Sequence, residues 1–342
     1  MKNYYGIRIV LLLVITSLWG CSARAVEGGQ GDGPVIMRLA HNQGENHPIH
    51  TSLSEFARLV EEKTEGSIDM KLYPGGQLGS EREAIELTQT GAIDFAKVSA
   101  STLENFSEEY SVLSLPYLFD DKDHFYKVMN SGIAEELYDA TRDIGFKGLT
   151  FYDSGTRNFY TKDTPILHPD DLQGMKVRVQ PTPTTIEMIE LMGGAPTPMP
   201  FGEVYTSLQQ GVIDGTENNE TALTDANHGE VAKEYSFSGH AIVPDILIIN
   251  EKKWNQLTEE QRELIQEAAD ESTVFHKEVW KEAVESAIEK SKENGVTFHE
   301  VDLEPFIQAV QPLHEEFATK ESTTDYYKEI RELSVDGNKE GE

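Results

Sequence analysis

Cysteine is nearly absent from this sequence, since Cys21 is the only one among 342 residues. A single cysteine excludes an intrachain disulfide, a paired-cysteine zinc site and a Cys-X-X-Cys redox motif. The fold must therefore be held together by its apolar core. The roughly 300 residues from Pro34 onward are enough to form such a core, divided into two lobes.

The sequence also lacks an apolar run long enough to span a membrane, which takes about 20 residues. The longest run near the start, Ile9–Trp19, follows the basic residues Lys2 and Arg8 and is typical of a secretory signal. It ends directly before Gly20 and Cys21, as in a bacterial lipoprotein cleavage site. We therefore predict a signal peptide over residues 1–20, a lipid on Cys21 and a glycine-rich tether over 21–33. The alternatives are an ordinary signal peptide followed by a chance cysteine, or an uncleaved anchor.

Basic residues are scarce: 29 Lys and Arg stand against 60 Asp and Glu, and the net charge is −31. Such a charge repels nucleic acid and anionic membrane surfaces, so neither is expected as a partner. It also repels an anionic solute at long range. Any site for an anion must therefore be a local basic pocket. The acidity as a whole is best explained by solubility outside the cell.

Sequence motifs for catalysis and metal binding are missing as well. The sequence contains no G-x-S-x-G, H-E-x-x-H, phosphate-binding G-x-x-x-x-G-K-[ST] or paired zinc motif. His47 and His50 come closest to metal-ligand spacing, but no acid stands beside them at zinc spacing. We predict a protein without metal, cofactor or enzymatic activity. An exported enzyme acting on sugar acids is the alternative from a different class.

Strand and helix patterns alternate in the first part of the chain. Strands are expected over 35–40, 68–72 and 92–98, with a helix capped by Asn46 between the first two. A second helix is expected to open with the capping box Ser80–Glu83. This alternation predicts an α/β lobe with a largely parallel sheet.

A second lobe is expected after a helix over 122–144 and a strand over 148–152. Its predicted strands cover 175–180, 212–214 and 241–250, the last interrupted by Pro244. The capping box Thr258–Gln261 opens a helix that runs to about Asn294, roughly 50 Å long. Because this exceeds one lobe, we expect a helix that spans both lobes, with a coiled coil as the alternative. Beyond about Lys320 the polar chain is expected to fray.

Arg178 is the clearest candidate binding residue. It lies in a predicted strand, on the face opposite Val177 and Val179, and Pro181 ends the strand just after it. A guanidinium matches a carboxylate because its planar fork donates two parallel hydrogen bonds. A solvated surface side chain is the alternative. Arg157 lies at the predicted lobe junction, where a cleft usually holds a small ligand. Asn218 follows a predicted turn and either serves that turn or binds the ligand.

Several motifs together resemble one protein family. They are GGQLG at 75–79, KVRVQ at 176–180, PMPFGEVY at 198–205, LQQGVIDG at 208–215 and EN at 217–218. In this order and spacing the sequence resembles the solute-binding component of a tripartite ATP-independent periplasmic (TRAP) transporter, of the DctP type. The resemblance covers about 35–317, nearly the whole exported domain.

The resemblance implies a two-lobed periplasmic-binding-protein-like α/β fold (type II-like), with central mixed sheets, a cleft between the lobes and a long lobe-spanning helix. We place lobe I at 34–155 and 244–283, lobe II at 156–243 and 284–320, and a polar tail at 321–342. By the same resemblance Arg178 clamps the solute carboxylate and Asn218 lies beside it. Arg157 matches a second basic position, and Phe201 matches an aromatic residue that packs on the ligand. Asn42 and Glu81 match positions that vary with the solute.

Three further segments, 41–43, 79–83 and 97–100, resemble the branch that binds uronic acids, and they add His41 and Lys97 to the predicted site. Alternative roles are capping for Glu81 and ordinary surface positions for His41 and Lys97. The predicted solute is a hexuronate such as D-glucuronate or D-galacturonate. A C4-dicarboxylate, with Lys97 as second anchor, a 2-oxo acid or an aldonate are the alternatives. The predicted protein is a lipid-anchored monomer on the outer face of the cell membrane that delivers its solute to TRAP membrane subunits.

Overall fold

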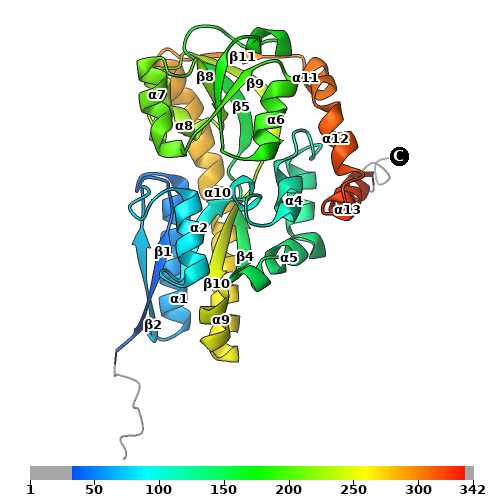
Figure 1. The fold of residues 1–342 in the computed structure, drawn as a ribbon. Coiled ribbons are helices and arrows are strands. Elements are labelled where there is room, and N and C mark those ends of the chain that lie inside the picture. Colours follow the sequence, from blue (N-terminus) through cyan, green and yellow to red (C-terminus); the bar gives the residue numbers. More distant parts are fainter. Residues whose placement is uncertain (1–32, 336–342) are drawn as a thin grey trace, which may run out of the picture. The chain divides into compact units, whose positions relative to one another are not determined.

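The computed structural model describes residues 33–335. Cys21, the predicted signal peptide and most of the predicted tether lie outside these residues. From Pro34 onward the described residues form one unit built on two mixed β-sheets (Figure 1). No described helix is both long enough and apolar enough to cross a membrane.

The first sheet, sheet A, has five strands in the order β2-β1-β3-β10-β4. Strand β1 pairs in parallel with β2 and β3, whereas β10 is antiparallel to both β3 and β4. Every residue of β10 is buried, as expected for a strand with neighbours on both sides. The strands are β1 Val35–Ala40, β2 Ile68–Tyr73, β3 Phe95–Ser99, β4 Phe146–Tyr152 and β10 Asp245–Asn250.

The helices that precede β4 include two whose starts were predicted from capping patterns. The capping box at Ser80 and Glu83 is confirmed. The first helix, in contrast, is capped by His47 rather than Asn46, with Pro48 as its first residue. The predicted helix over 122–144 is broken, because Ser131 caps a new helix. The helices are α1 Pro48–Lys63, α2 Glu81–Thr90, α3 Ala100–Leu103, α4 Lys122–Met129 and α5 Gly132–Asp139, with 3₁₀ turns at Glu108–Ser114 and Arg142–Ile144.

The second sheet, sheet B, has six strands in the order β11-β9-β5-β8-β6-β7. Strand β6 is parallel to β7 and β8, β5 is antiparallel to β8 and β9, and β11 is parallel to β9. The strands are β5 Thr156–Thr161, β6 Lys176–Val179, β7 Ala195–Pro198, β8 Gly215–Asn218, β9 Glu234–Ile242 and β11 Thr297–Glu300. Its helices are α6 Pro183–Leu191, α7 Val204–Gln210 and α8 Thr221–Asp225, with 3₁₀ turns at Pro169–Leu172, Phe201–Glu203 and His228–Glu230.

Two predicted strands are placed differently in the structure. The strand expected over 241–250 is two strands in different sheets, since β9 ends at Ile242 and β10 begins at Asp245. Pro244 lies between them, outside both strands. Its lack of an N–H therefore costs no hydrogen bond between strands. The strand expected over 212–214 begins only at Gly215, so Glu217 and Asn218 belong to β8 rather than to a turn.

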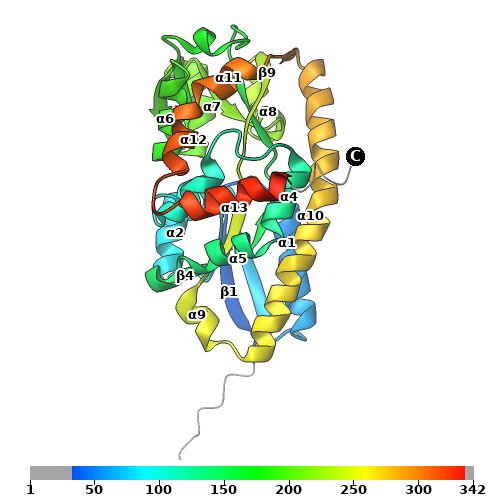
Figure 2. The same cartoon turned by 90° about the vertical axis from the view of Figure 1, so that its right-hand side faces the viewer.

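Helix α10, Glu259–Glu293, follows the short helix α9, Glu251–Gln256, and is 35 residues long. It packs on α1 and β4 of the first half and on α8 of the second, which confirms the expected lobe-spanning helix (Figure 2). Its buried residues include Ile265, Ala268, Ser272, His276, Trp280 and Ala287, whereas Phe275 is 38% exposed.

The end of the described chain is more ordered than we expected. After α11, Glu304–Ala309, and α12, Gln311–Phe317, residues Thr324–Val335 form helix α13 rather than a frayed polar segment. Helix α13 packs on α4 and α5, and its Ile330 is fully buried. Arg331 anchors it, because Nη1 donates to the Leu118 carbonyl at 2.9 Å. The exact boundaries of the two lobes stay a prediction.

Candidate ligand-binding site

A cleft of about 810 Å³ is lined by residues from the halves built on sheets A and B. Its volume lies in the range of small-molecule sites. The half that contains sheet A contributes Asn42, Glu81, Ser99, Thr102 and Asp245, and the half that contains sheet B contributes Arg157, Arg178, Met199, Phe201 and Asn218. Six of the eight predicted binding residues therefore line one cleft: Arg178, Arg157, Asn218, Glu81, Asn42 and Phe201.

Arg178 lies on β6 and is only 2% exposed. Its Nε and Nη2 donate to the Met199 carbonyl at 3.0 and 2.9 Å. Among the described residues no carboxylate bonds to this guanidinium, and Nη1 has no hydrogen-bond partner. Burial lowers the pKa of Arg178 to about 10, so the side chain is still charged at neutral pH. Arg178 thus gives the cleft wall a positive charge, and no carboxylate among the described residues forms an ion pair with it.

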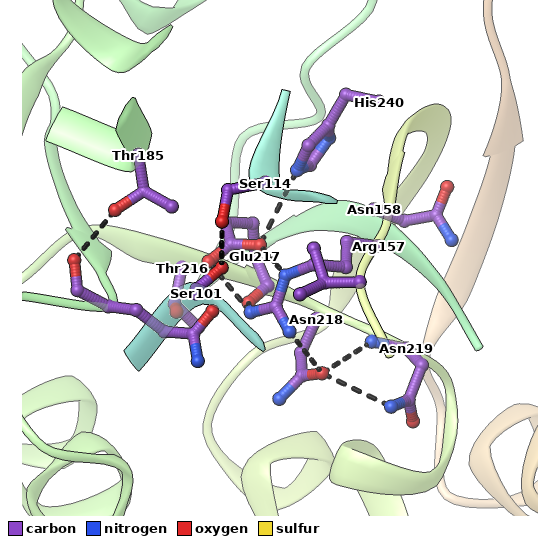
Figure 3. A network of polar contacts seen from close by, with 12 residues as sticks. Ser101, Ser114, Arg157, Asn158, Thr185, Thr216, Glu217, Asn218, Asn219 and His240 are labelled. Atoms are coloured by element: carbon purple, nitrogen blue, oxygen red, sulfur yellow. Dashed lines mark hydrogen bonds and ion pairs between the residues drawn. The ribbon is translucent and has the colours of Figure 1, made fainter. Parts of the chain in front are cut away.

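Arg157 is also buried on the cleft wall, but it is already paired (Figure 3). Its Nε donates to Glu217 Oε2, and its Nη2 donates to Glu217 Oε1 at 2.8 Å. Burial alone would lower the pKa of Arg157, but the charge and hydrogen bonds of Glu217 raise it above its ordinary value. Burial raises the pKa of Glu217, yet Arg157 and His240 together bring it down to about 2. Arg157 and Glu217 therefore form a neutral pair.

Asn218 is positioned by this pair at the end of β8. Its Oδ1 accepts from Arg157 Nη1 at 3.3 Å, from the Asn219 N–H at 2.9 Å and from Asn219 Nδ2 at 3.2 Å (Figure 3). Three donors to the oxygen leave the amide nitrogen as the group available to a ligand. No described residue accepts a hydrogen bond from Asn218 Nδ2, so the Asn218 amide is a donor on the same cleft wall as Arg178.

The opposite wall carries acceptors. Glu81 is the first residue of α2, and the capping box is made by Glu83 instead. The Glu81 carboxylate accepts from the Ser99 N–H at 3.2 Å and from Thr102 Oγ1 at 2.8 Å, and it lines the cleft. Its alternative role as the capping-box acid is therefore wrong. The side chain is instead held on the cleft wall by groups from β3 and α3.

Lys97 and His41 are not on the cleft wall, although we expected both to contact the solute. Lys97 is 1% exposed, and its Nζ donates to Asp245 Oδ2 at 2.9 Å and to Asn42 Oδ1 at 3.1 Å. Burial lowers the pKa of Lys97, but Asp245 and Glu81 raise it by more. His41 is buried, with Nε2 at 3.0 Å from His50 Nδ1, and burial lowers its pKa to about 3. Both side chains lie behind the wall, so neither is an ordinary surface residue.

The structure adds residues that the sequence interpretation missed. Asp245, His47, Thr102 and Gln180 all line the cleft. Asp245 had one available signal, because it is a charged residue directly before the apolar run Ile246–Ile249. Phe201 lines the cleft as expected, with its ring centroid 5.4 Å from that of His228.

The sequence matches the family described as bacterial extracellular solute-binding protein, family 7 (DctP), over residues 39–321. This chain belongs to the DctP family. The match covers both halves and the whole cleft, and it confirms the predicted TRAP solute-binding class.

Two solved structures and one curated relative illustrate the likeness of this DctP protein to others. A TRAP periplasmic solute-binding protein from Anaerococcus prevotii, with bound α/β-D-glucuronate, is 42% identical, with a TM-score of 0.86 over 88% of this chain and 99% of that chain. One from Xanthobacter autotrophicus, with bound β-D-galacturonate, is 36% identical, with a TM-score of 0.83 over 86% and 98%. The C4-dicarboxylate-binding periplasmic protein DctP of Rhodobacter capsulatus is 30% identical over 84% of this chain and 87% of its own length.

Proposed function

We propose that this DctP-family protein captures a hexuronate, such as D-glucuronate or D-galacturonate, outside the cytoplasm and delivers it to the membrane subunits of a TRAP transporter. The observation that carries the proposal is the state of Arg178, a buried guanidinium on the cleft wall without a carboxylate partner among the described residues. A buried charge is costly unless it is paired, so this site favours a ligand that supplies the missing anion.

The two walls of the cleft suit the two ends of a sugar acid. The ligand carboxylate accepts from Arg178 Nη1 and from the Asn218 amide. The sugar hydroxyls donate to the Glu81 carboxylate and to the remaining acceptors of the opposite wall. A ligand that bridges both walls has more contacts when the halves approach, so it favours the closed state. The bound hexuronates of the two similar structures support this assignment.

Calorimetric titration with hexuronates tests the proposal. Arg178→Met is expected to weaken binding by about 100-fold or more, because the ligand carboxylate loses its charged partner. Lys176→Met is the matched control, since it removes an exposed cation from the same strand. That variant should bind as the wild type does. Near-normal affinity of Arg178→Met would remove Arg178 from the site and would contradict the proposal.

The protein is proposed to bind its solute without converting it. The DctP family consists of substrate-binding proteins of transporters, which supports capture and release rather than turnover. Mass spectrometry of the ligand after incubation and denaturation of the protein tests this. Recovery of unchanged hexuronate is expected, and a converted product would identify an enzyme.

We propose further that the protein is a monomer tethered to the membrane through a lipid on Cys21. In a labelled culture, Cys21→Ser should abolish fatty-acid incorporation and release the protein into the soluble fraction. Unchanged membrane association of Cys21→Ser would reject the lipid anchor. The molar mass of the soluble variant, measured by light scattering, tests whether the protein is a monomer.

A further inference from the structure

The wall of the cleft opposite Arg178 is backed by a buried charge cluster, which we call the acidic cluster: Glu81, Asp245 and Lys97. Lys97 Nζ lies 2.9 Å from Asp245 Oδ2 and 3.5 Å from Glu81 Oε1. One cation thus faces two carboxylates, so the cluster carries a net negative charge. Lys97, the predicted second anchor for a dicarboxylate, is thus paired within the protein.

The contacts of Lys97 lie within the protein. Its Nζ donates to Asp245 Oδ2 and Asn42 Oδ1 and forms an ion pair with Glu81 Oε1 at 3.5 Å. Lys97 is also absent from the lining of the cleft, whereas Glu81 and Asp245 are part of it. A ligand at this wall therefore meets the two carboxylates and not the lysine.

The carboxylates keep acceptor capacity toward the cleft. Asp245 is 5% exposed, and its Oδ1 forms no hydrogen bond with any described residue. Glu81 has two hydrogen bonds and the ion pair with Lys97, and a carboxylate accepts at about four lone-pair positions. This wall can thus take hydrogen bonds from hydroxyl groups. A second ligand carboxylate, which has no donor, would face two like charges.

We propose, on the basis of the hexuronate capture proposed above, that the acidic cluster is a charge filter, with Asp245 as a specificity-determining residue. Arg178 binds one carboxylate, and the acidic cluster accepts only hydroxyl donors at the other end of the ligand. The substrate class is therefore a polyhydroxylated monoacid. C4-dicarboxylates and sugar diacids are rejected, in contrast to the solute named for the Rhodobacter capsulatus relative.

Calorimetric titration with three ligands of one carbon skeleton tests the filter at pH 8. They are a hexuronate, the corresponding hexarate with a carboxylate at both ends, and the monoamide of that hexarate. The wild type should bind the hexarate on the order of 100-fold more weakly than the hexuronate. The monoamide, which lacks the second charge, should recover most of this loss. The ligand comparison needs no variant and does not depend on any substitution folding.

Asp245→Asn should reduce the discrimination between hexuronate and hexarate to about tenfold or less, because Lys97 then balances Glu81 alone. Glu289→Gln, which removes an exposed carboxylate from α10, should leave the discrimination at the wild-type value. Equal binding of hexuronate and hexarate by the wild type would overturn the charge filter but leave hexuronate capture intact. Discrimination by Asp245→Asn equal to that of the wild type would also overturn the charge filter and leave hexuronate capture intact. Failure to bind either acid would overturn both proposals.

Discussion

The two arginines of the cleft differ in their neighbours. Arg157 is neutralised by Glu217, whose Oε2 also lies 3.4 Å from His240 Nε2, while Arg178 bonds only to a backbone carbonyl among the described residues. The pair holds Asn218 in place, because Arg157 also donates to its side-chain oxygen. A neutral buried pair beside an unpaired cation confines the positive charge to one point on the wall. We therefore assign Arg157 to positioning and Arg178 to binding.

The Arg157–Glu217 pair should make the free energy of unfolding decrease at acid pH. The folded-state pKa of Glu217 is about 2, below its ordinary value of 4.5, so its stabilisation is complete above pH 4.5 and is lost as the pH falls toward 2. Glu217→Gln leaves a buried unpaired Arg157, and we expect about 3 kcal/mol less unfolding free energy at pH 7. By pH 3 the difference between wild type and variant should shrink by about 2 kcal/mol. Urea denaturation at both pH values measures it, and a pH-independent difference would contradict the prediction.

At the scale of elements, the first half of the molecule caps a helix of the second. Helix α6 follows the strand of Arg178, and its own Thr182 makes no side-chain capping bond. Glu104, just after α3, supplies the cap instead: its Oε1 accepts from the Thr184 N–H at 3.0 Å and from Thr184 Oγ1 at 2.8 Å. Asn105 Nδ2 donates to the Pro181 carbonyl at 3.2 Å beside it. These contacts tie the α3 segment to the end of β6.

Removing the charge of Glu104 should make its capping contact with α6 more stabilising. Burial raises the pKa of Glu104, and its Oε2 is buried without a hydrogen bond among the described residues. An acid with a raised folded-state pKa stabilises less as the pH rises above its ordinary value. Glu104→Gln keeps one acceptor oxygen for Thr184 and should raise the melting temperature at pH 8 by about 1–3 °C. The benefit should vanish near pH 4.

Glu104→Ala is the comparison for that variant. It removes the acceptor of the Thr184 N–H, so its melting temperature should fall at both pH values. Differential scanning calorimetry of the three proteins decides the point. If Glu104→Gln lowered the melting temperature as much as Glu104→Ala does, the charge of Glu104 would be stabilising, and the expected gain at pH 8 would be wrong.

Elements set by local signals were predictable from the sequence. The helix starts at Ser80 and Thr258 follow from capping boxes that lie within four residues. Pro244 marks an interruption between β9 and β10 locally, but the assignment of these strands to different sheets depends on pairing with distant strands and was not predictable in this way. Helix α13 was missed because its apolar residues, Tyr326, Tyr327, Ile330 and Leu333, pack on parts of the chain that are distant in sequence.

The same distinction holds for the site. The alternation around Arg178 identifies the residue and its face from a few neighbours, and this local pattern was enough to predict its place. The role of Lys97 depends on Asp245, which lies 148 residues away along the chain. No local pattern relates these two residues, so the sequence alone could not show that Lys97 is buried behind the cleft wall and bonded to Asp245.

At the scale of the whole described unit, the chain passes between the halves at the turn from β4 to β5, at the turn from β9 to β10, along α10, and again between α11 and α13. Gly155, in the first turn, has φ +78° and could not carry a side chain, because a Cβ there would lie 2.8 Å from Asn219 Cβ. Trp280 of α10 is buried nearby, with its ring centroid 5.5 Å from that of His276. Tight packing at the connections leaves the cleft between the walls as the part that can close.

Closure should depend on ligand contacts with both walls. Small-angle scattering of the wild type should show a radius of gyration of about 19 Å for a unit of this length. It should fall by a few per cent with saturating hexuronate, because the hydroxyls draw the Glu81 wall toward the carboxylate bound at Arg178. Acetate has the carboxylate without the hydroxyls. At concentrations that protect the protein in a thermal-shift assay, it should leave the radius unchanged.

The contrast between these two ligands identifies which contact drives the motion. A carboxylate bound to Arg178 and Asn218 touches one wall only, so it gives no differential free energy between open and closed states. Hydroxyl donors to Glu81 and Asp245 add contacts that exist only when the walls approach. Equal compaction by acetate and hexuronate would mean that neutralising Arg178 alone closes the cleft. In that case the opposite wall would select the solute without helping to close on it.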